Sequence, residues 1–192
     1  MFHIEESLYK KGYKRIVGID EVGRGPVAGP VVSAAVIFPP DIDIFIEKDS
    51  KKLTPKKREQ LYELIFEKSI AIGIGVVDNT EIDKINIHNA TKLSMERAIF
   101  NLKTDFDFII TDFFKFDPYP HIAIKKADEQ SISVAAASIV AKVYRDKIME
   151  EFSKLYPFSF DKHKGYLTKQ HQEEIKQYGL SPIHRRSFKV KL

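Results

Sequence analysis

The chain has 192 residues, of which 43% are hydrophobic, and it carries a formal net charge of +4. This size and composition predict a single domain, residues 1–192, with a full apolar core. The absence of cysteine excludes disulfides and thiolate metal sites, and it fits the reducing cytoplasm. The first residues are too charged for a signal peptide, and no apolar run approaches the ~20 residues that span a bilayer. We therefore expect a cytoplasmic protein with no membrane segment.

Five apolar runs have the length and composition of β-strands: residues 15–20, 31–38, 70–77, 108–112 and 122–125. The first three lie close together in the sequence and predict a meander. A helix is predicted to begin at Thr54-Pro55, with Thr as the cap and Pro as the first residue, and helical patterns cover residues 89–102, 131–155 and 168–178. Strands followed by alternating strands and helices predict an α/β fold, in which helices pack on a mixed sheet.

The C-terminal part of the chain is strongly basic. Between Asp161 and Leu192 there are eight Lys or Arg residues and three acidic residues. A basic segment beside an acidic site indicates a polyanionic substrate. From charge alone, the alternative is a solvated surface segment.

The most informative motif places two carboxylates, Asp20 and Glu21, at the end of the first predicted strand. A glycine-rich turn, Gly23-Arg24-Gly25, follows directly. Carboxylate oxygens are the ligands that Mg²⁺ and Mn²⁺ prefer. Glycines let backbone amides approach a ligand closely, and arginine binds phosphate. The motif therefore predicts metal-assisted chemistry on a phosphate-bearing polymer.

Two further acids occupy related positions, since Asp112 ends the fourth predicted strand and Asp128 follows the fifth. Ligands of α/β sheets bind beyond the strand ends, so all four acids are expected to meet at one edge of the sheet. Divalent cations would relieve their mutual repulsion, and two ions ~3.5–4 Å apart can bind a phosphodiester and activate water. As alternatives, Asp112 and Asp128 are ordinary turn or cap residues, Asp20 and Glu21 form a solvated pair, or Glu21 offers only its backbone carbonyl.

Two other ligand classes fit the sequence poorly. The dinucleotide fingerprint is G-x-G-x-x-G, but here the third glycine, Gly29, is one place late and Pro26 interrupts the helix start. A zinc site is disfavoured because no two of the six histidines have i, i+4 spacing and cysteine is absent. His163 and His184 are therefore interpreted as structural residues or phosphate contacts.

The longest predicted helix, residues 131–155, carries a polar stripe. Ser138, Lys142, Arg145 and Asp146 are spaced so that they share one side. One interpretation is a solvent-facing side with an internal ion pair. The other is a border of the site, because the helix is otherwise rich in alanine and apolar residues.

Six blocks of the sequence together resemble one family, type 2 ribonuclease H, the ribonuclease HII of bacteria. Each block alone is short, but their order is collinear and they extend over nearly the whole chain. They are residues 18–32, 49–62, 81–95, 131–149, 163–171 and 184–188.

The resemblance implies a ribonuclease H-like fold, with a mixed five-stranded sheet flanked by helices in residues 1–155 and a helical, basic extension in residues 156–192. It implies an endonuclease that hydrolyses the RNA strand of RNA–DNA hybrids and cuts at single ribonucleotides embedded in duplex DNA, leaving 3′-hydroxyl and 5′-phosphate ends. The family's ligands for Mg²⁺ or Mn²⁺ fall here on Asp20, Glu21, Asp112 and Asp128. Its sensors of the RNA-to-DNA junction fall on Gly23-Arg24-Gly25 and Tyr166.

Substrate recognition can also be predicted by residue. The 2′-hydroxyl distinguishes RNA from DNA, and the backbone of the glycine-arginine-glycine turn is expected to hydrogen-bond it while the Tyr166 ring stacks on the neighbouring deoxyribose. Contacts to phosphates position a duplex and make affinity depend on salt. Candidates for these contacts are Lys51, Lys52, Lys142, Arg185 and Arg186. We expect a monomer that binds nucleic acid and has no obligate protein partner.

The sequence departs from the family pattern at three places: Phe113 and Ala127 stand where glycine is common, and Asn89 where histidine or glutamine is common. The first two affect the backbone beside Asp112 and Asp128. The core begins near Lys14, which favours this type over a sister type with a large additional N-terminal domain. The alternatives are another metal nuclease of the same fold, such as a junction resolvase, and a non-catalytic nucleic-acid-binding module. The four acids argue against the second, because a phosphate binder gains nothing from them.

Overall fold

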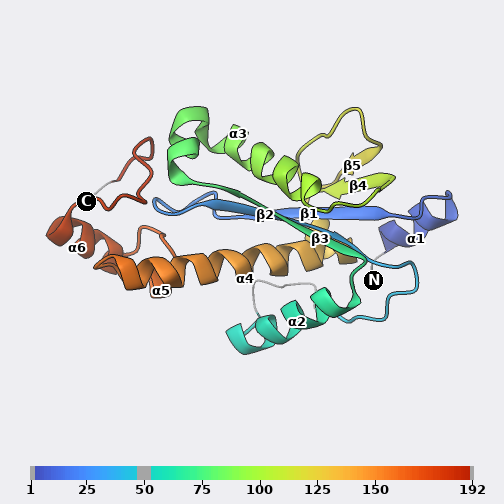
Figure 1. Ribbon diagram of the computed structural model, residues 1–192, viewed down its shortest axis with the longest axis horizontal. Helices are drawn as coiled ribbons and strands as arrows, with labels where there is room; N and C mark the ends of the chain where they lie inside the picture. Colours follow the sequence, from blue (N-terminus) through green and yellow to red (C-terminus); the bar gives the residue numbers. More distant parts are fainter. Residues whose placement is uncertain (1–2, 47–52, 191–192) are drawn as a thin grey trace.

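The protein is described by a computed structural model that covers residues 3–46 and 53–190 (Figure 1). A five-stranded sheet forms its centre, in the order β3-β2-β1-β4-β5. The strands are β1 (Ile16–Val22), β2 (Val31–Ile37), β3 (Ala71–Val77), β4 (Phe108–Thr111) and β5 (His121–Ala123). The first three pair antiparallel, which confirms the predicted meander, and β1, β4 and β5 pair parallel. The predicted mixed five-stranded sheet is therefore confirmed.

Six α-helices and one 3₁₀-helix accompany the sheet in the described part of the chain. They are α1 (His3–Lys10), α2 (Pro55–Lys68), α3 (Asn79–Phe100), η2 (Ala127–Glu129), α4 (Ile132–Leu155), α5 (Phe160–His163) and α6 (Lys169–Tyr178). The predicted starts of α2, α4 and α6 are confirmed, because Thr54, Ser131 and Thr168 each accept a hydrogen bond from the first turn of their helix. None of the described helices combines the length and apolarity needed to cross a bilayer.

Helix α3 begins earlier than the sequence predicts. It starts at Asn79 rather than at residue 89, where Asp78 and Glu81 form a capping box. Asn86 interrupts the helix with φ 66° and ψ 164°, so its apolar stripe does not keep one period along its length. This interruption explains why only the second part was predicted as a helix.

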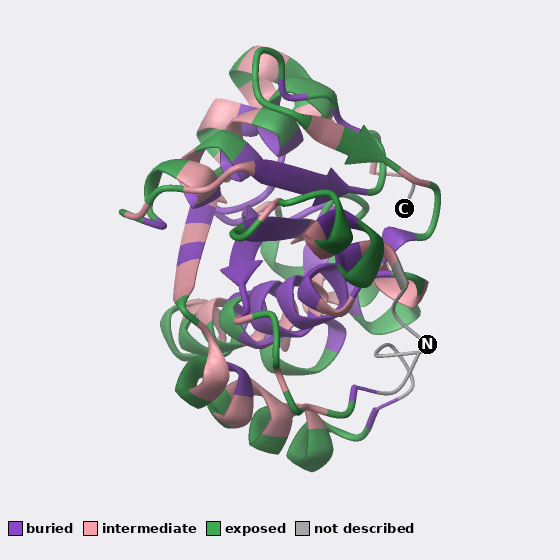
Figure 2. Cartoon of the chain, turned by 90° about the vertical axis from the view of Figure 1, so that its right-hand side faces the viewer, coloured by how far each residue is buried: buried purple, intermediate pink, exposed green. Residues whose placement is uncertain are grey.

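The helices cover the two faces of the sheet. Figure 1 shows α3 on one face and α4, with α2 outside it, on the other. Strand β2 is buried on both sides because alternate residues point to opposite faces. Val32 and Val36 pack in the cluster with α4, whereas Ala35 and Ile37 pack with residues of α3. Figure 2 shows the resulting arrangement, with buried residues in the central strands and a central helix and exposed residues on the outer helices, while edge strand β5 is largely exposed.

Glycines allow the helices to approach the strands closely. A Cβ atom on Gly75 of β3 would overlap the backbone of Ser94 and Ala98 in α3. On the other face, a Cβ atom on Gly18 of β1 would overlap the backbone of Ser133 and Val134 at the start of α4. These two contacts fix the distance between the sheet and both helices.

We expect Gly75→Ala to lower the free energy of unfolding by about 2–3 kcal/mol, because helix α3 must shift to make room for the methyl group. Urea titration followed by circular dichroism measures this loss. Ile74→Val, on the same strand, is the control and should cost about 1 kcal/mol. A loss at Gly75→Ala no larger than that of the control would contradict the close approach.

The chain beyond α4 packs against the segment that follows the glycine-arginine-glycine turn. The amide of Val27 donates to the carbonyl of Gly165, and the amide of Arg185 donates to the carbonyl of Val27. Ala28 forms a β-bridge with His184, and apolar residues of both segments share one buried cluster. Residues 27–29 are therefore held from both sides by the C-terminal part of the chain.

Candidate active site

The topology brings the predicted acids to one edge of the sheet. Asp20 and Glu21 end strand β1, and Asp112 directly follows strand β4. Because β1 and β4 are parallel neighbours, with Gly18 opposite Ile110, their carboxyl ends lie together. Asp128 lies in η2, immediately before helix α4, which packs on β1.

A pocket of about 240 Å³ opens at this edge. Three of the four predicted acids line it, together with residues of helices α2 and α4. The lining residues are Asp20, Glu21, Val22, Arg58, Asp112, Ser138, Ile139 and Lys142. A carboxylate-lined pocket beside a helix thus forms where the sequence predicts it.

Asp20 lies in an environment that disfavours its charge. Burial raises the pKa of Asp20 well above its usual value, and the negative charges of Glu21 and Asp128 raise it further. The Glu21 amide and the Ser138 side chain donate hydrogen bonds that lower the pKa only in part. Asp128 is therefore close enough to Asp20 to interact with it, as the sequence analysis predicts.

Glu21 is subject to opposing influences. Burial raises its pKa most, the positive charge and hydrogen bond of Arg24 oppose that rise, and the charge of Asp112 adds to it. Arg24 Nη1 lies 3.2 Å from Glu21 Oε1. Asp112 Oδ1 in turn accepts a 2.7 Å hydrogen bond from the amide of Lys126. The four acids thus interact in two pairs, Asp20 with Asp128 and Glu21 with Asp112, that meet at the adjacent residues of β1.

The chemistry of these donors fits a hard divalent cation. They are oxygen ligands, the two on β1 are poorly solvated, and their mutual repulsion would be relieved by positive charge. In the described part of the chain, however, no group of three or more His, Asp or Glu side chains is arranged so that it could hold a metal ion. Glu21 and Asp112 instead bind Arg24 and the Lys126 amide. The donor set therefore fits such an ion without being a preformed coordination shell.

The polar stripe of α4 divides between two environments. Ser138 and Lys142 line the pocket, and Lys142 Nζ donates to Asp146 Oδ1 at 2.6 Å. Arg145 is fully buried, and its guanidinium donates to the carbonyls of Pro30, Lys164 and Ala28. The stripe therefore borders the site at two positions, and Arg145 has a structural role within the core.

The predicted phosphate contacts also differ in position. Arg185 is 1% exposed, and its guanidinium donates to backbone carbonyls, so its position does not suit the phosphate contact that the sequence predicts. Arg186 is exposed, and its amide binds Asp83. Lys51 and Lys52 lie outside the described residues. Among the candidates that the structure describes, Lys142 alone lines the pocket.

The glycine-arginine-glycine turn and Tyr166 lie side by side. Gly23 has φ +94°, and Arg24 and Gly25 are exposed. A Cβ atom built on Gly25 would lie 3.6 Å from Tyr166 Cε1. Tyr166 is 46% exposed, so its ring is accessible beside the turn. The two predicted junction sensors therefore form one surface.

Three histidines support the backbone of Tyr166 from behind. His163 and His171 stack with ring centroids 4.0 Å apart, and His171 Nε2 lies 3.0 Å from His184 Nε2. The amide of Ser181 donates to His184 Nδ1, so in the neutral ring Nε2 carries the proton and donates to His171. His171 Nδ1 then donates to the carbonyl of Tyr166 at 2.9 Å.

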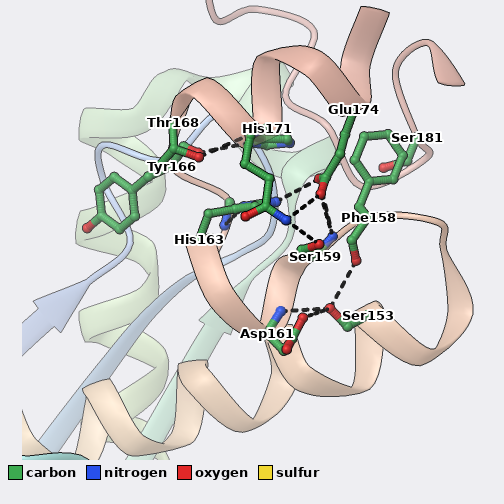
Figure 3. Close-up of polar contacts among 12 residues, drawn as sticks. Ser153, Phe158, Ser159, Asp161, His163, Tyr166, Thr168, His171, Glu174 and Ser181 are labelled. Atoms are coloured by element: carbon green, nitrogen blue, oxygen red, sulfur yellow. Dashed lines mark hydrogen bonds and ion pairs between the residues drawn. The ribbon is translucent and has the colours of Figure 1, made fainter. Parts of the chain in front are cut away.

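Figure 3 shows His163 and His171 of this cluster, with the Tyr166 ring pointing away from both. The predicted structural role of His163 and His184 agrees with these contacts, since both are buried and hydrogen-bonded.

Two residues that contact the pocket or the start of α4 are not indicated by the sequence patterns. Arg58 of α2 lines the pocket and lies 4.0 Å from Asp146. The sequence indicates only that Arg58 lies in the helix predicted to begin at Thr54-Pro55. Glu5 of α1 is buried and accepts hydrogen bonds from Ser131 and Ser133 at the start of α4. No local pattern marks that contact, because it joins distant parts of the chain.

Comparison with known proteins identifies the family of this chain. A family described as Ribonuclease HII matches residues 17–191. The chain is 53% identical over 192 residues to the ribonuclease HII of Sulfurihydrogenibium sp., covering 99% of this chain and 98% of that protein. The chain belongs to the ribonuclease HII family. It is therefore an enzyme of the endoribonuclease class, and the fold predicted from its sequence blocks is confirmed.

Other relatives extend the comparison. The ribonuclease HII of Aquifex aeolicus is 50% identical over 189 residues, covering 98% of this chain and 96% of that protein. Among solved structures, the ribonuclease H2 of Pyrococcus horikoshii superposes with a TM-score of 0.73 at 30% identity, over 91% of this chain and 94% of that one. The ribonuclease HII in a PCNA complex from Archaeoglobus fulgidus gives 0.74 at 27% identity, over 93% and 96%.

Proposed function

We propose that this ribonuclease HII hydrolyses the RNA strand of RNA–DNA hybrids and cuts at single ribonucleotides embedded in duplex DNA. The observation that carries the proposal is the carboxylate-lined pocket beside the surface formed by Gly25 and Tyr166. A pocket for phosphodiester chemistry and a surface suited to sensing ribose are thus adjacent. The reaction proposed is two-metal-ion hydrolysis that leaves 3′-hydroxyl and 5′-phosphate ends.

Asp20, Glu21, Asp112 and Asp128 would hold Mg²⁺ or Mn²⁺. When bound, such ions polarise the phosphodiester and offset the charge that develops on its oxygens. Lys142 and Arg58 line the same pocket and are placed to attract a phosphate. Because Asp146 contacts both side chains, it fixes the position of these cations at the pocket wall. Arg24 neutralises Glu21 in the free enzyme.

The 2′-hydroxyl is the group that separates ribose from deoxyribose, and it both donates and accepts hydrogen bonds. The exposed backbone at Arg24 and Gly25 is suited to bind it. The Tyr166 ring beside Gly25 is suited to stack on the following deoxyribose. We propose that the enzyme works as a monomer in the cytoplasm and needs no obligate protein partner.

A direct test uses the purified chain and a labelled duplex with one ribonucleotide, incubated with Mg²⁺, with Mn²⁺ or with EDTA. We expect cleavage only with a metal, and only at the ribonucleotide, with ends that ligase and phosphatase assays identify as 3′-hydroxyl and 5′-phosphate. An all-DNA duplex and a four-way DNA junction are the comparison substrates. Cleavage of the junction in preference to the ribonucleotide would favour a resolvase, and binding without cleavage would favour a non-catalytic module.

We expect Tyr166→Ala to lower kcat/KM on the one-ribonucleotide duplex by roughly tenfold more than on a uniform hybrid, because only the former presents a single RNA-to-DNA junction. Steady-state kinetics on both substrates measure the ratio. Tyr178→Ala removes another exposed tyrosine, on helix α6, and should leave the ratio unchanged. Equal losses on both substrates in Tyr166→Ala would remove its proposed role.

A further inference from the structure

The feature that remains unexplained is a buried arginine beneath the glycine-arginine-glycine turn. Arg185 Nη2 donates to the Gly23 carbonyl at 2.6 Å, Nη1 donates to the Arg24 carbonyl at 3.1 Å, and Nε donates to the Gly29 carbonyl at 2.9 Å. No carboxylate in the described part of the chain forms an ion pair with it. Its guanidinium thus hydrogen-bonds only to main-chain carbonyls, and it also lies over the Phe188 ring, 5.0 Å from the ring centroid.

This contact is costly to stability. Burial and the like charge of Arg145 lower the pKa of Arg185 to about 9. The charge of Asp83 opposes this shift only in part, and a buried charge without a direct ion pair is ordinarily disfavoured, even when carbonyl dipoles surround it. Apolar packing would hold residues 23–29 at a lower electrostatic cost. The presence of a guanidinium at this position is therefore explained by its effect on the conformation of the turn.

The carbonyl contacts determine where the turn's amides point. In a trans peptide the N–H points opposite to the preceding C=O, and the one cis peptide found in the described residues is Asp117-Pro118. Because the Gly23 and Arg24 carbonyls are directed inward to Arg185, the amides of Arg24 and Gly25 point outward. Both residues are exposed, and neither amide donates a hydrogen bond to any described residue.

We propose that Arg185 is a positioning residue that presents the Arg24 and Gly25 amides as paired donors to the oxygen of a ribose 2′-hydroxyl. The inference rests on the proposed function and adds the residue that sets the recognition geometry. The adjacent outward amides form a pair of donors, and the Tyr166 ring borders this pair at Gly25. An arginine is required because its rigid fork holds two successive carbonyls at once, whereas lysine has a single charged nitrogen.

Binding without cleavage provides the first test. Fluorescence anisotropy in EDTA gives the Kd for a one-ribonucleotide duplex and for the same duplex in all-DNA form. We expect Arg185→Lys to reduce the ratio of these two constants by roughly five- to tenfold while affinity for the all-DNA duplex stays within about twofold. An unchanged ratio in folded Arg185→Lys would overturn the inference.

Arg97→Lys is the control, because Arg145 packs directly against Gly23 and is not independent of the turn. The Arg97 guanidinium also donates to a main-chain carbonyl, that of Val76, and its other hydrogen bonds are to Glu81. Its substitution should lower stability and leave the discrimination ratio unchanged. If both variants lost discrimination equally, general loosening of the fold would replace the specific role of Arg185. Thermal unfolding of each variant checks that it is folded at the temperature of the assay.

A second measurement uses the wild-type enzyme and does not depend on a variant folding. Amide hydrogen exchange followed by NMR should show rapid exchange at Arg24 and Gly25 in the free enzyme and protection with the one-ribonucleotide duplex alone. Protection by both duplexes would mean that the amides bind phosphate, which would overturn the inference. A wild-type enzyme that neither cleaves nor distinguishes the duplexes would overturn the proposed function as well, whereas cleavage without protection would overturn only this inference.

Discussion

Substituting Asp20 by asparagine is expected to lower the rate of cleavage at a single ribonucleotide by at least about a hundredfold. The substitution preserves the size of the side chain and removes the charge on which the metal assignment depends. Single-turnover assays in Mg²⁺ and in Mn²⁺ measure the loss. Asp41→Asn changes an exposed acid beyond the far end of β2 and should cleave normally.

The same substitution should have the opposite effect on stability. Because the pKa of Asp20 is raised in the folded chain, its contribution to stability is largest at low pH and is lost as the pH rises through that value. In EDTA at pH 8, Asp20→Asn should therefore unfold at a higher urea concentration than the wild type. Mn²⁺ should raise the midpoint of the wild type and leave that of the variant nearly unchanged.

These two readouts separate a metal ligand from a merely structural residue. A variant that cleaves at near wild-type rates would contradict the metal assignment. So would a variant that is destabilised in EDTA, because the carboxylate would then contribute favourable contacts to the metal-free fold. Titration calorimetry with Mn²⁺ adds a measurement that does not depend on the substrate.

The second large expected effect is a loss of folding stability at low pH, which is caused by protonation of His184. Burial and the neighbouring His171 lower the pKa of His184 from 6.5 to about 4. An unfolded chain binds a proton at this residue below about pH 6.5, whereas the folded chain does so only near pH 4. The contribution of His184 is thus complete above pH 6.5 and is lost as the pH falls to 4, by an amount on the order of 3 kcal/mol.

Urea titrations between pH 7 and pH 4 measure this effect by comparison with His184→Gln. The variant should be less stable at pH 7, because the bonds to Ser181 and His171 are altered, but its stability should fall less steeply with acid. The two proteins have the same acidic residues, so the difference between the two curves reports on His184. His121→Gln, at the edge strand β5, controls for the removal of one histidine. Parallel curves for wild type and His184→Gln would contradict the assignment.

The sequence was sufficient to predict elements whose signals are local. The residues Thr54, Ser131 and Thr168 mark the helix starts correctly, and short apolar runs locate the strands. Helix α1 has no comparable signal, and its place depends on Glu5, which binds residues more than a hundred positions away. A buried carboxylate that binds the start of a distant helix leaves no periodic pattern near itself.

The residues of the candidate site also divide into those that the sequence predicts and those that it does not. Acids at the ends of strands could be grouped from the sequence, because parallel neighbouring strands end at one edge of a sheet. The environment of each arginine could not be predicted from the sequence. An arginine that binds phosphate and one that binds buried carbonyls look the same there. Arg185 and Arg186 are adjacent, yet the first lies inside the molecule and the second on its surface. The two arginines differ only in how each is placed against the segment that follows β1.

The long sequence separation between Gly23 and Arg185 has a consequence for how the molecule is completed. Their contact spans 162 positions, whereas the residues that line the pocket all occur by Lys142. During synthesis from the N-terminus, the carboxylate pocket can assemble before the guanidinium that orders the turn has emerged from the ribosome. A nascent or truncated chain would then hold the proposed hydrolytic groups without the Arg185 contact that orients the Arg24 and Gly25 amides. Under this proposal, selectivity for ribose is established after the hydrolytic pocket has formed. Chains that fail to close this long loop would lose selectivity before they lose activity.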